Sequence, residues 1–262
     1  MSVVSDWRVS SVLAAERGWS ILRRDAVSML ASIPNASVDM ISTDPAYESL
    51  EKHRAAGGTT GRLIRSEQSS NDWFPIFHNH RFPELLAHMY RVLKRDRHAY
   101  IMCDDDTSDV LKPMAKAAGF RVWSRLAAVY GDDVEPEPGS ERLLWDKKVI
   151  GMGYHWRSRH EFILFLEKGK RRLNNLGWPN VIECKRVMRR GAYPTEKPEE
   201  LYERLLLNST QPGELILDPF CGSGSGGAAA IRQGRIWIGS DISPEAMRRS
   251  AERCMEAERC RE

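Results

Sequence analysis

The stretch Leu217-Asp218-Pro219-Phe220-Cys221-Gly222-Ser223-Gly224-Ser225-Gly226-Gly227 decides the fold. An apolar run, residues 214–217, leads into it, and an Ala-rich run follows it. Gly222, Gly224 and Gly227 satisfy G-x-G-x-x-G, a spacing that lets the backbone turn tightly and approach a ligand where a Cβ would clash. The sequence therefore predicts a strand, a glycine-rich turn and a helix whose first N–H groups are free.

An acidic residue ends the next expected strand. Residues 235–239 are apolar, and Ser240-Asp241 follows them. A carboxylate at that position can accept hydrogen bonds from both hydroxyls of a ribose. The pattern fits a dinucleotide as well as S-adenosylmethionine, so the turn alone leaves the ligand open.

Seven apolar runs that end in polar or turn residues predict seven strands, over 20–22, 38–42, 98–103, 120–130, 161–166, 214–217 and 235–239. Helices are expected at 83–93, 109–118, 198–208, 224–233 and 244–258. This alternation predicts an α/β fold with a seven-stranded, mostly parallel sheet and helices on both faces. The runs 120–130 and 161–166 have no helix between them, which predicts an antiparallel hairpin at one edge.

The position of the glycine turn predicts a permuted chain. Only enough residues for one helix follow Asp241, so the remaining strands must come from the N-terminal part. We therefore expect a circularly permuted Rossmann-like fold in which the strand before Asp25 lies beside the strand that ends at Asp241.

Length and composition predict an ordinary globular protein of one large domain or two small ones. The 262 residues are 42% hydrophobic and 29% charged, with a net charge of +3. No apolar run reaches the roughly 20 residues of a membrane span, and no signal-peptide pattern opens the chain. The five cysteines are odd in number and form no C-x-x-C pair, which disfavours disulfides or a zinc site and fits a cytoplasmic protein.

A second motif, Thr43-Asp44-Pro45-Ala46-Tyr47, follows the strand at 38–42. Parallel sheets bind ligands at the carboxyl ends of their strands, so this turn should open beside the glycine turn. The Asp44 carboxylate and the Pro45 carbonyl could each accept one N–H of an aryl amine, and Tyr47 could stack on its ring. This scheme needs no metal. The alternative is an ordinary Asp-Pro turn at the end of a strand.

These motifs together resemble the β-class amino-methylating DNA methyltransferases. Asp44-Pro45-Ala46-Tyr47 matches their D-P-P-Y motif with one departure, at Ala46, and Phe220, Gly222 and Gly224 match F-x-G-x-G. The catalytic motif precedes the cofactor motif, as in the β class. The segments 193–198 and 145–169, the latter with His160-Glu161, are similar to further segments of the family.

The resemblance implies S-adenosylmethionine as cofactor and transfer of its methyl group to adenine N6 in duplex DNA, after the base is flipped out. A leading Asp favours adenine, cytosine N4 is the alternative, and an RNA substrate also stays open. A single catalytic domain over 1–262 is implied as well. A homodimer is also implied. The catalytic residues would be Asp44, Pro45 and Tyr47, with Ala46 loosening their turn. The cofactor-binding residues would be Asp25, Thr195, Lys197, Asp218, Phe220, Gly222, Ser223, Gly224 and Asp241. Cys221 has no preceding proline, so it is expected to pack beneath the turn.

Two irregular segments are candidates for DNA contact. The first, residues 168–192, holds eight basic residues that suit phosphate contacts: Lys168, Lys170, Arg171, Arg172, Lys185, Arg186, Arg189 and Arg190. The resemblance implies that this segment is the target-recognition segment. The alternative there is a solvated basic face. The second, residues 48–81, is expected to be a mobile lid.

Two other classes of protein stay open. An NAD-linked oxidoreductase would use the same G-x-G-x-x-G and bind NADH, but it leaves residues 44–47 without a function. A DNA-binding protein silenced at Ala46 would bind DNA without cofactor and transfer no methyl group.

Overall fold

The computed structural model describes residues 10–12, 18–48, 76–123, 143–150, 155–187, 193 and 196–261. Its strands are β1 (Trp19–Arg23), β2 (Val38–Thr43), β3 (Leu93–Cys103), β4 (Arg121–Trp123), β5 (Leu143–Asp146), β6 (His160–Lys168), β7 (Val181–Glu183), β8 (Leu215–Asp218) and β9 (Ile236–Asp241). Its helices are α2 (Ala26–Ala31), η3 (Asn79–Arg81), α4 (Phe82–Val92), α5 (Asp105–Ala117), α6 (Glu199–Ser209), α7 (Ser225–Arg232) and α8 (Pro244–Arg259).

One mixed sheet runs through the described residues, in the order β1-β9-β8-β2-β3-β6-β5-β7, with β4 also paired to β6. The first five strands of this order are parallel to one another. β6 is antiparallel to β3, to β4 and to β5, whereas β7 is parallel to β5. The predicted α/β fold class is confirmed. The predicted antiparallel pairing of the runs 120–130 and 161–166 is confirmed by the pairing of β4 with β6.

Within the described residues the sheet has nine strands rather than seven. β5 and β7 were missed because they are only four and three residues long, too short to show a period. They extend the sheet beyond the first part of β6, whereas β4 pairs with residues 165–167 of β6 and has no other partner among the described strands, so the predicted antiparallel pair does lie at an edge of the sheet. β3 begins earlier than expected because its first half, residues 94–97, is charged and carries no apolar signal in the sequence. The expected strand at 120–130 is described only as far as Trp123.

The predicted permutation is confirmed by the pairing of β1 with β9. The two strands are parallel, and Arg23 lies opposite Asp241. The chain therefore enters the sheet beside the strand that is last in sequence. Asp25 follows β1 at the same end of the sheet at which Asp241 ends β9.

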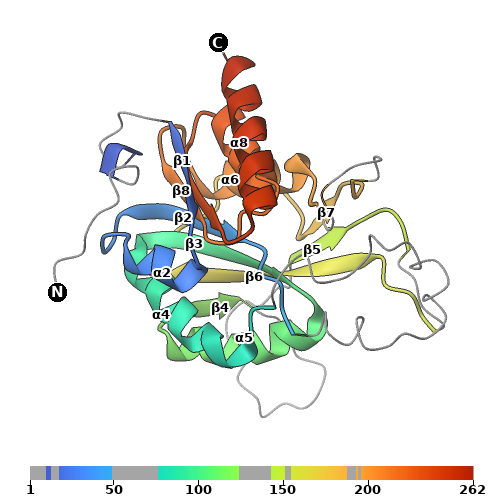
Figure 1. The fold of residues 1–262 in the computed structure, drawn as a ribbon. Helices are drawn as coiled ribbons and strands as arrows, with labels where there is room; N and C mark the ends of the chain where they lie inside the picture. The colour runs from blue at the N-terminus through green and yellow to red at the C-terminus, as the bar shows by residue number, and fades with distance from the viewer. Residues whose placement is uncertain are drawn as a thin grey trace.

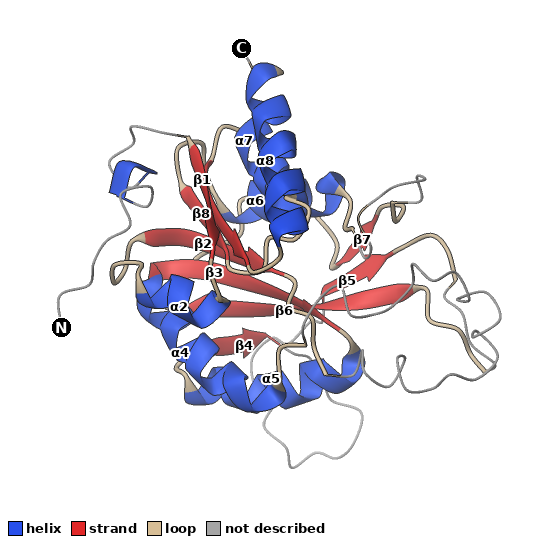
Figure 2. Ribbon diagram, viewed as in Figure 1, coloured by secondary structure: helices blue, strands red, loops and turns tan. Residues whose placement is uncertain are grey.

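Helices cover both faces of the sheet. Figures 1 and 2 show α2, α4 and α5 on one face and α6, α7 and α8 on the other. Each group encloses its own apolar core with the sheet. The short α2 was not predicted; Asp25 caps it by accepting from the backbone N–H groups of Val27 and Ser28. α5 begins four residues earlier than expected, where Asp104 caps it.

The two ends of the parallel strands differ in character. At the carboxyl end, β2, β8 and β9 stop at Thr43, Asp218 and Asp241, which brings the two sequence motifs together. At the other end, the buried carboxylate of Asp39 accepts from Lys94 at 2.8 Å and from Arg97 at 3.0 Å. The carboxyl end therefore holds the candidate site, and the opposite end is closed by ion pairs.

Candidate active site

The glycine turn uses its glycines for different purposes. Gly222 and Gly224 both have positive φ, 48° and 80°. A Cβ on Gly224 would lie 2.7 Å from the Cα of Ser250, so this glycine lets α8 pack against the turn. Among the described residues, a Cβ on Gly222 would have only the Tyr193 ring within 4 Å, at 3.7 Å. Of the two, only Gly222 lines the pocket.

Two carboxylates hold the turn in shape. Asp218 is buried, and its Oδ1 accepts from the hydroxyl of Thr43 at 2.8 Å and from the backbone N–H of Phe220 at 3.1 Å. Burial raises the pKa of Asp218 to about 7. Asp218 therefore ties the end of β2 to the glycine turn from behind the pocket wall.

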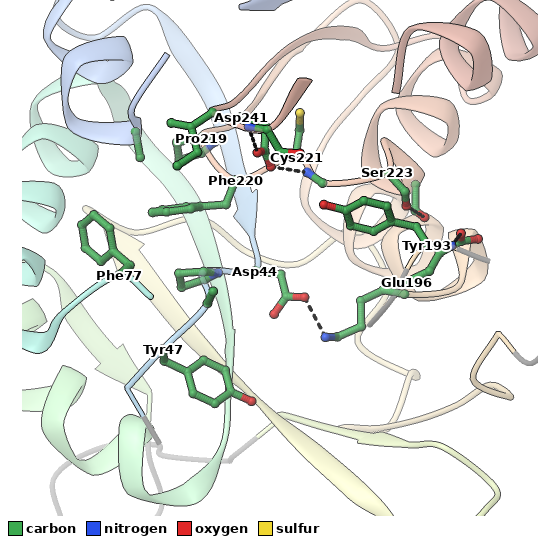
Figure 3. Close-up of a pocket in the computed structure, with 18 of the residues that line it drawn as sticks. Asp44, Tyr47, Phe77, Tyr193, Glu196, Pro219, Phe220, Cys221, Ser223 and Asp241 are labelled. Atoms are coloured by element: carbon green, nitrogen blue, oxygen red, sulfur yellow. Dashed lines mark hydrogen bonds and ion pairs between the residues drawn. The ribbon is translucent and has the colours of Figure 1, made fainter. Parts of the chain in front are cut away.

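Asp241 faces the pocket from the end of β9, as Figure 3 shows. Its two oxygens accept from the backbone N–H groups of Gly222 at 3.1 Å and Ser243 at 2.8 Å. Each carboxylate oxygen has two lone pairs, so both retain capacity for a ligand hydroxyl. Burial raises the pKa of this carboxyl.

Asp44 forms an ion pair with Lys197 at the centre of the site (Figure 3). The Nζ of Lys197 lies 2.6 Å from Oδ2 of Asp44 and 3.3 Å from Oε2 of Glu161. Burial raises the pKa of Asp44, and the ammonium of Lys197 opposes that rise. Burial alone would lower the pKa of Lys197, but the two carboxylates outweigh it and raise that pKa. Lys197 was expected near the cofactor, and the structure places its ammonium on the candidate catalytic carboxylate.

Aromatic rings form one wall of the pocket. Phe77 packs edge-on against Phe220, with ring centroids 5.0 Å apart. The N–H of Phe77 donates to the carbonyl of Ala46 at 2.7 Å, which pins residues 44–47 beside Phe77. Tyr47 is largely buried, and its remaining surface lines the pocket.

Asp25 is fixed by a neighbouring arginine. Both of its oxygens accept from Arg81, at 2.9 and 3.0 Å, and the Arg81 guanidinium also lies over the Phe77 ring. Burial would raise the pKa of Asp25, but Arg81 and the N–H groups of α2 outweigh it and lower that pKa. Both side chains line the pocket.

One cavity of about 510 Å³ joins most of the predicted site. Its lining includes these predicted residues: Asp25, Asp44, Pro45, Tyr47, Lys197, Phe220, Gly222, Ser223 and Asp241. Asp218 and Gly224 support the pocket from behind and do not line it. Thr195 lies outside the described residues.

Several lining residues were missed. They include Phe77, Arg81, Trp145, Lys147, Glu161, Glu196 and Tyr202. Phe77 and Arg81 belong to the segment expected to be a lid, and both line the pocket. His160-Glu161 was a signal in the sequence, because the resemblance singled out that pair without giving Glu161 a role. The remainder of the expected lid, residues 49–75, lies outside the described residues.

The basic segment 168–192 is divided between the two ends of the sheet. β6 runs antiparallel to β3, so Lys168 lies opposite Arg97, at the end away from the pocket. The ammonium of Lys168 donates to the carbonyls of Tyr90 and Leu93, at 2.6 and 2.7 Å. Arg171 pairs with Glu214 at 3.5 Å. The ammonium of Lys168 is therefore used within the fold, and its expected phosphate contact stays a prediction.

Lys185 and Arg186 lie at the pocket end instead. They follow β7, which is parallel to β5, and Arg186 lines the pocket. Both are exposed. Lys170 and Arg172 are also exposed, but they lie with Lys168 at the far end. Arg189 and Arg190 are outside the described residues.

Two features are absent from the described residues. In that part of the chain, no group of three or more His, Cys, Asp or Glu side chains could hold a metal ion. No described helix is long and apolar enough to cross a membrane.

A sequence model of the N6/N4 family, described as DNA methylase, matches residues 38–252. The chain belongs to the N6/N4 DNA methylase family. The methylase is 27% identical to the DNA adenine methyltransferase YhdJ of Escherichia coli strain K12, over 86% of this chain and 79% of that protein. It is 26% identical to the type II methyltransferase M2.DpnII of Streptococcus pneumoniae, over 91% of this chain and 90% of that protein.

Solved structures share the fold of the methylase. The cytosine-N4-specific PvuII DNA methyltransferase matches with a TM-score of 0.64 at 17% identity, covering 90% of this chain and 86% of that one. A DNA modification methylase of Thermus thermophilus, solved with S-adenosylmethionine, matches with a TM-score of 0.60 at 18% identity, covering 90% and 93%. The predicted resemblance and the Rossmann-like fold are thereby confirmed.

Cys221 of the methylase has the environment of a packing residue. It is buried, and its Cβ lies 3.0 Å from the position that a Cβ on Gly239 would take. Burial raises the pKa of its thiol well above the ordinary value. A neutral thiol is a poor nucleophile, so Cys221 is unsuited to attack on a cytosine ring.

Proposed function

We propose that this DNA methylase transfers a methyl group from S-adenosylmethionine to the N6 amine of adenine in duplex DNA. The observation that carries the proposal is the shared pocket: Asp44 borders the same cavity as Gly222 and Asp241. The Asp44 carboxylate, which would bind the target amine, and the Asp241 carboxylate, which would bind the ribose of the cofactor, thus border the same cavity. The amine of a paired base is inaccessible, so the target adenine has to be flipped out of the duplex.

The pocket fits S-adenosylmethionine in size and chemistry. Its volume of about 510 Å³ is within the range of about 300–1,000 Å³ that small-molecule sites span. Asp241 would accept from the ribose hydroxyls, and the open face of Gly222 would admit the methionine part. Asp25 would lie near the adenine ring of the cofactor. When bound, the cofactor supplies an electrophilic methyl group carried on a sulfonium.

The protein's own task is to present the target nitrogen. The lone pair of an aryl amine is delocalised into its ring and is a weak nucleophile. Asp44 and the carbonyl of Pro45 each accept one N–H, which orients the nitrogen toward the methyl donor. Because the Asp44 carboxylate accepts a hydrogen bond from the target amine, it is in position to take the proton that the nitrogen loses on methylation. Tyr47 stacks on the flipped base.

The departure at Ala46 does not argue for a silenced enzyme. The carbonyl of Ala46 accepts from the Phe77 N–H, so the turn is held by a contact that needs no proline side chain. Pro45, whose carbonyl the proposal uses, is present and lines the pocket. These contacts support an active turn.

DNA would reach the pocket across Lys185 and Arg186. Both are exposed at the pocket end of the sheet, where phosphates could pair with them. A homodimer and the roles of Thr195, Arg189 and Arg190 stay predictions.

The test is to incubate the protein with methyl-labelled S-adenosylmethionine and mixed-sequence duplex DNA, and to analyse the nucleosides by mass spectrometry. We expect labelled N6-methyldeoxyadenosine. Detection of N4-methyldeoxycytidine would support methyl transfer to an exocyclic amine but would show that the target base is cytosine and not adenine. Cofactor binding without transfer to any of several DNAs would favour the silenced DNA-binding protein. Binding of NADH in place of S-adenosylmethionine would favour an oxidoreductase.

A further inference from the structure

Lys197 lies between two carboxylates on the floor of the pocket. Its Nζ is 2.6 Å from Oδ2 of Asp44 and 3.3 Å from Oε2 of Glu161. Only 10% of its side chain is exposed. No described residue donates to the other oxygen of Asp44, Oδ1, so that oxygen is left for a ligand.

The position of Lys197 is fixed from more than one side. Glu161 is also paired with Lys147, at 3.4 Å, so four alternating charges run from Lys147 to Asp44. The Trp145 ring lies 5.9 Å from Nζ, and its own N–H donates to the carbonyl of Cys184 at 2.9 Å. The lysine thus has little freedom to leave Asp44.

The charge balance of this chain matters because the site is buried. A carboxylate that is removed from water without a cation becomes protonated at neutral pH. A protonated Asp44 would offer a donor where the target amine needs an acceptor. Removing one member of a buried ion pair leaves the other uncompensated, which is costly.

We propose that Lys197 is a positioning residue. It keeps the Asp44 carboxylate ionised and fixes its orientation, so that Oδ2 is paired with Nζ of Lys197 and Oδ1 is free to accept an N–H of the target amine. The role at the amine rests on the proposed function, whereas the ionisation of Asp44 does not. This role differs from the cofactor contact that the family resemblance implies for Lys197.

The first experiment measures the ionisation of Asp44 without turnover. Protein labelled with ¹³C at aspartate carboxyls is titrated by NMR, and the Asp44 signal is assigned by its loss in Asp44→Asn. In Lys197→Met we expect the Asp44 carboxyl to titrate about one pH unit or more higher than in the wild type. Lys197→Arg should titrate close to the wild type. An unchanged titration in Lys197→Met would overturn the proposal, whether or not the protein methylates DNA.

The second experiment separates positioning from cofactor binding. Single-turnover methylation is measured across pH, and cofactor affinity is measured by calorimetry. In Lys197→Met we expect a loss of about tenfold or more near neutral pH that recovers as the pH rises, because the base form of Asp44 returns. The Kd for S-adenosylmethionine should stay within about threefold, which also shows that the variant folds.

Glu161→Gln is the matched control. It removes one charge from the same chain of ion pairs. The ion pair between Lys197 and Asp44 remains, and the amide oxygen of the glutamine can still accept from Nζ of Lys197. Because the Glu161 carboxylate raises the pKa of Asp44, we expect the pH profile of Glu161→Gln to move to lower pH, opposite to the shift in Lys197→Met. A Lys197→Met variant whose Kd rises in step with its loss of rate, at an unchanged pH profile, would instead make Lys197 a cofactor ligand. If the wild-type protein transferred no methyl group, the proposed function would be wrong. The NMR titration would still show whether Lys197 keeps the Asp44 carboxyl ionised.

Discussion

Gly222 and Gly224 are two residues apart and both have positive φ, but their surroundings differ. The position of a Cβ on Gly224 is occupied by α8, through Ser250. The position of a Cβ on Gly222 is open toward the pocket. At the scale of single residues, the motif therefore combines a packing requirement with a binding requirement.

Alanine at each position should separate the two requirements. Gly224→Ala combines a strained φ with a 2.7 Å approach to backbone, so we expect a loss of about 2–4 kcal/mol in the free energy of unfolding. Gly222→Ala should cost about 1 kcal/mol of backbone strain and weaken S-adenosylmethionine binding about tenfold. Thermal unfolding and calorimetry measure the two effects. Equal destabilisation by both variants, with unchanged affinity, would contradict this division.

At the scale of elements, the site depends on one carboxylate that joins two strand ends. Asp218 at the end of β8 accepts from Thr43 at the end of β2 and from Phe220 in the glycine turn. The two motifs, far apart in sequence, are thereby held in register. The sequence predicted the order of these elements and their meeting point, because buried strands and turn residues have strong local signals. It did not predict the contact between Thr43 and Asp218, which depends on the packed sheet.

The raised pKa of Asp218 predicts how stability changes with pH. The folded-state pKa is about 7, above the ordinary value of 3.8, so between these values the folded protein holds a proton that the unfolded chain has lost. Its contribution to stability is therefore full below about pH 4 and is lost as the pH rises through about 7.

Asp218→Asn keeps an acceptor oxygen for Thr43 and Phe220 but cannot ionise. Relative to the wild type, we expect this variant to become more stable with rising pH, by as much as about 4 kcal/mol across that interval. Urea unfolding at a series of pH values measures the difference. A difference that is constant from acid to neutral pH would contradict the raised pKa.

At the scale of the whole molecule, the sheet divides the basic residues of one sequence segment. Lys168, Lys170 and Arg172 lie at the end of the sheet opposite the pocket, and Lys185 and Arg186 lie at the pocket end. Net charge in the sequence could not reveal this division, because it depends on the reversal of β6 and on the short β7. The fold class could be predicted because alternation and the two turns are local features, whereas Glu161, Phe77 and Arg81 enter the pocket only through tertiary contacts.

Paired charge reversals test which cluster contacts DNA. Lys185→Glu with Arg186→Glu should weaken duplex binding at least about tenfold and reduce its salt dependence. Lys170→Glu with Arg172→Glu changes the charge equally at the far end and should leave binding within about twofold. Fluorescence anisotropy over a range of salt concentrations measures both. Equal losses for the two pairs would show that proximity to the pocket does not decide the contact.

The measurement that tests the central claim most directly compares the wild type with Asp44→Ala. Both are incubated with labelled S-adenosylmethionine and a duplex that the wild type methylates, after calorimetry has shown that both bind the cofactor. We predict labelled N6-methyldeoxyadenosine from the wild type and at least about a hundredfold less from Asp44→Ala, because the amine loses its acceptor. Full methylation by Asp44→Ala would contradict the assignment of the catalytic turn.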